Sequence, residues 1–120
     1  MSLAAQATAS RQHARYPVDL TVDYATRDAF LASHVSNLGR GGLFIECAHP
    51  LRIDSELEMT FILPGSDERI TARGRVVWSD DLRKGTARLV SGMGVRFVDI
   101  SRADRRRLSD CLAALPPLPV

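Results

Sequence analysis

The 120-residue chain has little of what exported, membrane-spanning or strongly nucleic-acid-binding proteins need. It has two cysteines, Cys47 and Cys111, in no metal-type spacing with each other or with a histidine, so we expect free, buried thiols in a reducing compartment. No signal peptide and no apolar run long enough to cross a bilayer can be found, which favours a cytoplasmic protein that does not enter the membrane. The net charge of +2 and the 6% of aromatic residues disfavour a barrel that binds nucleic acid.

The residue patterns of catalysis are missing as well. The three histidines lie apart: His13 in a basic segment, His34 in an alternating segment, and His49 before a proline. We find no serine in a nucleophile elbow, no paired carboxylates, no phosphate-binding loop and no metal-ligand motif. The acidic pairs Asp67–Glu68 and Asp80–Asp81 fall in predicted loops, where we expect them to face solvent. The sequence therefore predicts a protein that is not an enzyme and needs neither a metal nor a cofactor.

What the chain does have is the period-two alternation of half-buried strands. Such strands are predicted over residues 18–24, 30–36, 43–47, 57–63, 70–78 and 93–97. Ser79 to Gly85 is predicted to be a polar loop, and Thr86 to Val90 a short strand that pairs back. Six or seven short antiparallel strands close most economically into a small barrel, so the fold class is mainly β.

The periodicity changes near the C-terminus. Ser101 can cap a helix, and Asp104 lies three residues on, close to the positive end of that helix. Leucines then recur at helical spacing, at Leu108, Leu112 and Leu115. The sequence predicts one helix over about 101–115 that covers an open end or a side of the barrel. Within it, Arg105 to Arg107 point in different directions, so we expect a solvated helix face and not one basic patch.

The N-terminal residues 1–10 are small and polar, which predicts a disordered leader. Residues 11–120 then form a single domain. Arg11 and Arg15 stand four residues apart just before the first strand. Guanidinium groups match phosphate oxygens and the O6/N7 edge of guanine, so an arginine pair on a mobile arm can fold over an anionic ligand. A solvated, charged lead-in to the strand is the simpler interpretation of two arginines alone.

A glycine-rich segment, Asn37-Leu38-Gly39-Arg40-Gly41-Gly42, leads directly into the apolar run Leu43-Phe44-Ile45. Glycine adopts positive φ without steric cost, so we expect a tight turn that feeds a strand. A turn with a nearly bare backbone also lets a ligand come close. For three glycines alone, a simple β-turn is the simpler interpretation.

Taken together, the two segments resemble the PilZ domain family, small barrels that bind the bacterial second messenger cyclic di-GMP. The family pattern is Arg-x-x-x-Arg, an interval, and then Asp/Asn-x-Ser-x-x-Gly; here Arg11 to Arg15 supplies the first half. Asn37 to Gly42 supplies the second, with Gly39 where the family has serine. Gly74 to Trp78 and Gly92 to Val98 also look like strands of the family, so the resemblance covers about residues 11–115.

The resemblance implies a binding site for cyclic di-GMP. Arg11 and Arg15 would engage phosphates and guanine edges, Asn37 would bond a guanine, and Gly42 would keep the backbone close. A lost serine hydroxyl at Gly39 is worth about 0.5–1.5 kcal/mol, which weakens binding without abolishing it. The second half of the family pattern can also be aligned with His34-x-Ser36-x-x-Gly39. This alignment keeps the serine, but its last glycine leads into Arg40 instead of an apolar strand, so it is disfavoured.

Two functional hypotheses follow. The first is a non-enzymatic cyclic di-GMP receptor that signals to an unidentified effector protein. The alternative, which Gly39 motivates, is a degenerate PilZ-like adaptor that binds no nucleotide and acts through protein contacts. Dimerisation stays open, since a free barrel edge or the apolar stripe of the helix could pair two chains.

Overall fold

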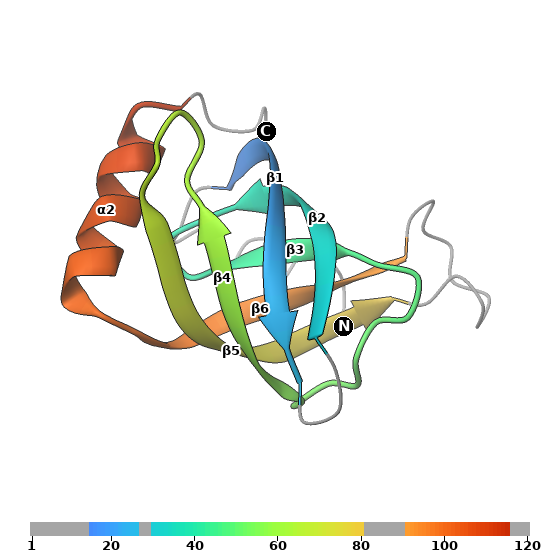
Figure 1. The fold of residues 1–120 in the computed structure, drawn as a ribbon. Coiled ribbons are helices and arrows are strands. Elements are labelled where there is room, and N and C mark those ends of the chain that lie inside the picture. The colour runs from blue at the N-terminus through green and yellow to red at the C-terminus, as the bar shows by residue number, and fades with distance from the viewer. Residues whose placement is uncertain (1–14, 27–29, 81–90, 116–120) are drawn as a thin grey trace.

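The computed structural model describes residues 15–26, 30–80 and 91–115, which form six strands and one helix (Figure 1). The elements are β1 (Tyr16–Ala25), β2 (Phe30–Leu38), β3 (Gly42–Glu46), β4 (Glu56–Ile62), β5 (Arg69–Asp80), β6 (Gly92–Ile100) and α2 (Arg102–Ala113). The leader predicted over residues 1–10, Arg11 and the strand predicted over 86–90 lie outside the described residues.

The strands close into one antiparallel barrel in the order β1-β2-β3-β6-β5-β4. Closure comes from the pairing of β1 with β4, in which Val22 lies opposite Phe61. The last strand, β6, is inserted between β3 and β5. The predicted mainly-β barrel with one C-terminal helix is confirmed, with six strands in the described part of the chain.

The predicted alternation decides which side chains fill the barrel. In β4, for example, Leu57, Met59 and Phe61 are buried and the residues between them are more exposed. Aliphatic side chains dominate the interior, joined by the stacked rings of Phe61 and Phe97. Burial of such side chains is the main favourable term in folding a domain of this size.

Strand β5 is longer than its sequence pattern predicted. Ser79 and Asp80 belong to it because they lie opposite Met93 and Gly92 of β6, so the loop expected to begin at Ser79 begins later. Asp80 is half-buried and not a solvent-facing loop residue, which corrects that expectation. Alternation alone could not show that the polar end of β5 continues to pair.

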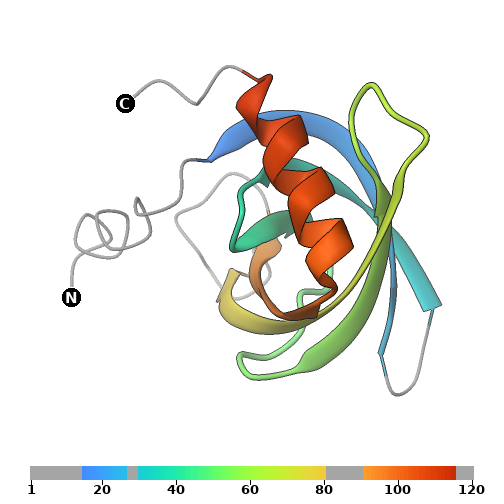
Figure 2. The same ribbon diagram turned by 90° about the vertical axis from the view of Figure 1, so that its left-hand side faces the viewer.

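Helix α2 lies across one end of the barrel, as Figure 2 shows. Ser101 caps it by accepting a hydrogen bond from the Asp104 amide at 3.0 Å, as predicted. Leu108 and Leu112 are buried in the barrel core, and Leu115 packs against it. The apolar stripe of the helix is therefore used to close the barrel and is not free to pair two chains.

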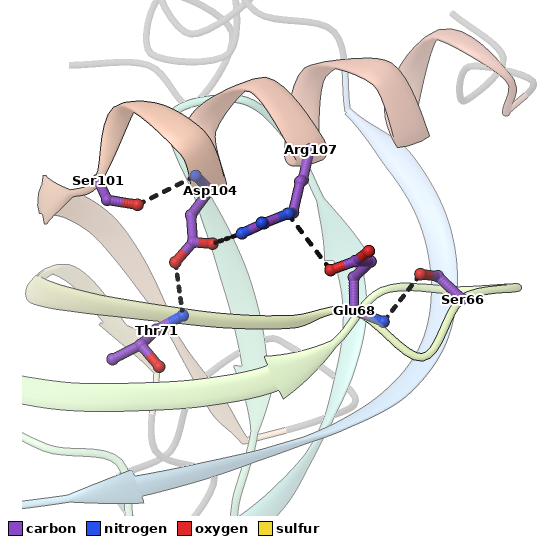
Figure 3. Close-up of polar contacts among 6 residues, drawn as sticks. All are labelled: Ser66, Glu68, Thr71, Ser101, Asp104 and Arg107. Carbon is purple, nitrogen blue, oxygen red and sulfur yellow. Dashed lines mark hydrogen bonds and ion pairs between the residues drawn. The ribbon is translucent and has the colours of Figure 1, made fainter.

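Polar contacts fix the helix to the β4–β5 hairpin (Figure 3). The Asp104 carboxylate accepts a hydrogen bond from the Thr71 amide at 3.2 Å and one from Arg107 at 2.7 Å. Arg107 also pairs with Glu68 at 3.3 Å, and the Glu68 amide donates to Ser66 Oγ. Arg107 and Glu68 are both exposed, as expected, but they form an ion pair across 39 positions of sequence that the sequence pattern did not predict.

Both cysteines are free, as predicted, but each is half-buried and not fully buried. The Cys111 thiol lies 3.9 Å from the Pro64 carbonyl oxygen, between α2 and the hairpin. The described residues contain no cluster of metal-binding side chains. The single described helix is too short and too polar to cross a membrane.

Candidate functional site

The glycine-rich segment forms the turn between β2 and β3. The Gly39 amide donates to the Gly42 carbonyl oxygen at 2.9 Å, which closes the turn. The Phe97 amide of β6 donates to the Gly41 carbonyl oxygen at 2.8 Å, which ties the turn to the neighbouring strand. Arg40 lies exposed at its tip. The turn is thus a fixed feature of this barrel end.

The reason for the glycines differs from the one expected. The predicted tight turn is present, but positive φ among the described residues is found at Gly65 and Asp54 and not at the glycines of this turn. Gly42 is required for another reason: a Cβ built there would overlap the Val95 carbonyl oxygen of β6. Close strand packing explains this glycine, and its predicted contact with a ligand remains a prediction.

Irregular pairing sets the orientation of Asn37. The register shifts between Val35 and Asn37 in the β2–β3 pair, and the β1–β2 register also shifts nearby. The buried residues of β2 at this point are Val35 and Leu38, three positions apart, so Asn37 leaves the regular inward alternation. Register shifts of this kind often re-aim a side chain beside a binding site.

The side-chain carbonyl of Asn37 is an unsatisfied polar group. Its Oδ1 atom is buried and has no hydrogen-bond partner among the described residues. Such groups are rare, because a buried acceptor without a partner costs about 1–3 kcal/mol. The position therefore favours a ligand that donates a hydrogen bond.

Arg15 immediately precedes β1, at the end of that strand that pairs with Asn37. Tyr16 pairs with Leu38 and Pro17 with Asn37, and the same register continued by one residue places Arg15 opposite Gly39. Arg15 is half-buried, and burial lowers the pKa of its guanidinium from the ordinary value. None of the ion pairs between described residues includes it. A cation with reduced hydration and no carboxylate partner favours an anionic ligand.

Of the five predicted site residues, the structure brings four together. Arg15, Asn37, Gly39 and Gly42 lie where β1, β2 and β3 meet at one end of the barrel. Arg11 lies outside the described residues.

The alternative alignment of the family pattern would make His34 the first residue of the motif, but its side chain has other partners. Its Nε2 atom lies 3.0 Å from Asp19 Oδ1 and its Nδ1 atom 3.5 Å from Glu46 Oε1. Both ring nitrogens therefore face carboxylates of the neighbouring strands. Asn37 Oδ1, by contrast, has no hydrogen-bond partner among the described residues.

An aromatic pair beside Asn37 was missed in the sequence. Phe44 lies opposite Asn37, Gly94 lies opposite Phe44, and Trp78 lies opposite Gly94. The Phe44 and Trp78 rings have centroids 5.3 Å apart and are tilted by 41°. Because the two residues are 34 positions apart in sequence, only strand pairing reveals them. They add an apolar surface next to the polar groups of the turn.

Comparison with known proteins identifies the fold. Residues 9–114 match the family model of the PilZ domain. No curated protein matches the chain.

Three similar solved structures share the fold at low sequence identity. The PilZ domain of YcgR from Escherichia coli with c-di-GMP has a TM-score of 0.68 and 16% identity, covering 88% of this chain and 90% of that one. The Bacillus subtilis inhibitor of motility, MotI/DgrA, has a TM-score of 0.71 and 18% sequence identity. The match covers 86% of this chain and 50% of MotI/DgrA, so this chain spans half of its length. The PilZ domain of CeSA from a cellulose-synthesizing bacterium has a TM-score of 0.59 and 12% sequence identity, and the match covers 79% of this chain and 90% of that domain.

Proposed function

The chain belongs to the PilZ domain family, and we propose on that basis that it is a non-enzymatic cyclic di-GMP receptor that signals to a partner protein. One observation supports this more than any other. Arg15, a half-buried cation, lies two residues before the strand position that pairs with Asn37, and neither Arg15 nor the buried Asn37 carbonyl has a partner among the described residues. A ligand that offers both an anion and an N–H donor would satisfy both groups at once.

Cyclic di-GMP has this chemistry. Its phosphodiesters carry negative charge, and the Watson–Crick edge of guanine presents N–H donors next to the O6 acceptor. Arg15 would form charge-assisted bonds to a phosphate or to the guanine O6/N7 edge, and Asn37 Oδ1 would accept from a guanine N–H. Arg11, on the segment before β1, would supply a second guanidinium. The apolar rings of Phe44 and Trp78 offer a surface for the base beside Asn37.

The glycine at position 39 tunes this site without removing it. A serine hydroxyl there would add one hydrogen bond, worth about 0.5–1.5 kcal/mol or up to roughly tenfold in affinity. The charge-assisted contacts of the arginines contribute more. We therefore expect saturable but modest affinity for the nucleotide.

Calorimetric titration of the full chain with cyclic di-GMP, with GTP as the control ligand, tests the proposal. We expect selective, saturable binding that Arg15→Ala weakens by about a hundredfold, because a charge-assisted contact is lost. Asn37→Ala should weaken it by about tenfold. Arg52→Ala is the matched control, since Arg52 is an exposed arginine in the loop before β4.

Absence of selective binding to the wild-type chain would overturn the proposal. So would equal losses of affinity in Arg15→Ala and Arg52→Ala, because they would reflect net charge and not a site. The thermal unfolding of each variant, measured alongside, shows whether a lost signal has a structural cause.

The second candidate is an adaptor that acts without nucleotide. Gly39 motivates it, because this residue replaces the serine of the family pattern. The motility inhibitor among the similar structures is named for its effect on motility, which is compatible with action through another protein. If this candidate holds, Arg15→Ala leaves a partner interaction intact, and no cyclic di-GMP binding is measured.

A further inference from the structure

We propose that the outward face of α2 is a docking surface for an acidic segment of a partner protein. The surface consists of Arg102, Arg105 and Arg106, which we call the arginine face. These positions are related by i, i+3 and i+4, so their side chains are neighbours on the helix surface. All three are exposed. The sequence pattern alone had suggested a solvated face with no single patch.

Within the described part of the chain, no carboxylate forms an ion pair with the arginine face, although the exposed Asp110 follows Arg106 by four residues. The carboxylates nearest to the helix on its inner side, Asp104 and Glu68, both pair with Arg107. No ion pair between described residues includes Arg102, Arg105 or Arg106. Positive charge is therefore concentrated on the side of α2 that faces away from the barrel.

The placement of these charges works against helix stability. All three lie in the N-terminal half of α2, where the helix dipole is positive, and the last turn has no basic residue. Cations near the N-terminus are unfavourable, whereas the same side chains near the C-terminus would be favourable. A purely structural helix gains nothing from this arrangement. Binding of an acidic partner explains it, because the dipole and the arginines attract the same negative charge.

The helix is also well anchored, so the arginine face is presented in one orientation. Leu108 and Leu112 are buried beneath it. Asp104 accepts from the Thr71 amide, and Arg107 reaches Glu68 of the hairpin (Figure 3). Rigid presentation lowers the entropy that a partner must lose on binding.

Charge complementarity selects the partner class. The exposed large apolar residues of the described chain lie on strands or loops and none on α2, so the helix has no apolar face to insert into a lipid surface. Asp110 follows the arginines on the exposed surface, and no aromatic residue lies in α2, which disfavours a continuous polyanion such as nucleic acid. A short acidic protein segment matches a compact patch of three arginines.

The arginine face offers a surface for the partner protein that the proposed function requires. Any influence of the nucleotide on docking rests on that proposed function. Helix α2 and the β2–β3 turn lie at the same end of the barrel (Figure 2). A ligand held by Arg15 and Asn37 would thus be bound close to the docked partner. Docking itself needs no nucleotide.

The test is fluorescence polarisation of the full chain with a labelled glutamate-rich peptide as probe, at low ionic strength. We expect saturable binding that weakens with added salt. Arg102→Glu/Arg105→Glu should weaken it by at least about tenfold, because two attractive contacts become repulsive. The same double variant should unfold at an equal or higher temperature, since glutamate is favoured near a helix N-terminus. Its cyclic di-GMP affinity should be unchanged.

The matched control is Arg52→Glu/Arg96→Glu, which changes the net charge equally at two exposed arginines that lie neither on α2 nor in the β4–β5 hairpin that holds it. An equal loss of peptide affinity in the control would overturn the proposal, as would no peptide binding to the wild type. Tighter binding to phosphatidylglycerol vesicles or to a thymidine oligonucleotide than to the peptide would also overturn it. If the wild-type chain binds the peptide but does not bind cyclic di-GMP, the result contradicts the proposed function and leaves the docking surface supported.

Discussion

Two polar regions at the same end of the barrel differ in how their hydrogen bonds are satisfied. The first, between α2 and the β4–β5 hairpin, joins Asp104, Arg107, Glu68 and the Thr71 amide in one network, which we call the closed network. The second, the β2–β3 turn with Arg15, leaves a cation and a buried carbonyl without partners among the described residues, and we call it the open turn. The difference separates a structural polar contact from a proposed binding site.

The closed network uses long side chains to satisfy one another, so its polar groups stabilise the native fold. The open turn reduces stability instead, because a partly desolvated cation and an unpaired acceptor both cost free energy in the absence of a ligand. Substitutions should therefore affect unfolding in the first region and binding in the second. The following predictions test that division, beginning with the largest effect.

Gly42→Ala should have the largest effect and would show that the open turn depends on tight packing beneath it. The added Cβ overlaps the Val95 carbonyl oxygen, and a backbone atom cannot move aside as a flexible side chain can. We expect a loss of about 3 kcal/mol or more in the free energy of unfolding, measured by denaturant titration. Gly65→Ala, at an exposed turn glycine with open space around it but φ of 71°, is the control and should cost about 1 kcal/mol. Equal losses would contradict the role given to Val95.

Asp104→Ala should come next and should affect stability alone. It removes the acceptor for the Thr71 amide, the partner of Arg107 and a favourable charge in the first turn of α2. We expect a loss of about 2 kcal/mol in the free energy of unfolding. The affinity for cyclic di-GMP should be unchanged under conditions in which the variant is fully folded. Asp104→Asn, which keeps acceptor capacity, should lose less. A selective loss of ligand affinity in either variant would contradict the division between the two regions.

Alkaline pH should destabilise the fold through groups outside the open turn. Burial raises the pKa of the Cys111 thiol, and burial is also the largest cause that raises the pKa of Tyr24. A raised pKa means that the folded state holds the proton more tightly than the unfolded state. The resulting stability is complete below the ordinary pKa values, and it is lost as the pH rises through the raised ones.

We therefore expect the unfolding temperature to fall as the pH is raised above about 9, near the ordinary pKa of a thiol. Cys111→Ala combined with Tyr24→Phe should flatten that decline in a thermal melt series. At neutral pH the tyrosine change also removes a hydroxyl that lies 3.3 Å from Ser33 Oγ, which costs about 1 kcal/mol. An unchanged decline in the double variant would assign the alkaline sensitivity to other groups.

Gly39→Ser should have the smallest effect, and it should appear in binding alone. Gly39 lies outside the left-handed region, so its backbone conformation can accommodate serine. The new hydroxyl opposite Arg15 should tighten cyclic di-GMP binding by up to about tenfold in a calorimetric titration. Gly41→Ser, two positions along the same turn, is the matched control and should not tighten it. If neither variant changes the affinity, the assignment of the family motif to Asn37–Gly42 is wrong.

The sequence predicted the strands and the helix well, because these depend on local periodicity. Alternation placed Leu57, Met59 and Phe61 inside the barrel, and Ser101 marked the start of α2. The family pattern selected Arg15 and Asn37 as site residues. In each case the signal lies within a few neighbouring positions.

Features that depend on distant partners could not be predicted. The Arg107–Glu68 pair and the Phe44–Trp78 contact join different elements of the folded barrel. The register shifts beside Asn37 arise from the pairing of β2 with its two neighbours, β1 and β3. Likewise, the requirement for glycine at position 42 comes from a carbonyl oxygen on β6, so the sequence suggested turn flexibility where close packing is the reason.

The position of β6 in the barrel has a consequence for synthesis on the ribosome. Because β6 lies between β3 and β5, those two strands have no partner on one side until residues 92–100 have been translated. The nascent chain must therefore carry the exposed edges of β3 and β5 until β6 has been made. The barrel closes only when β6 pairs with both strands, after which α2 can cover its end. We expect a release from chaperones or a gain in protease resistance only after that strand has emerged.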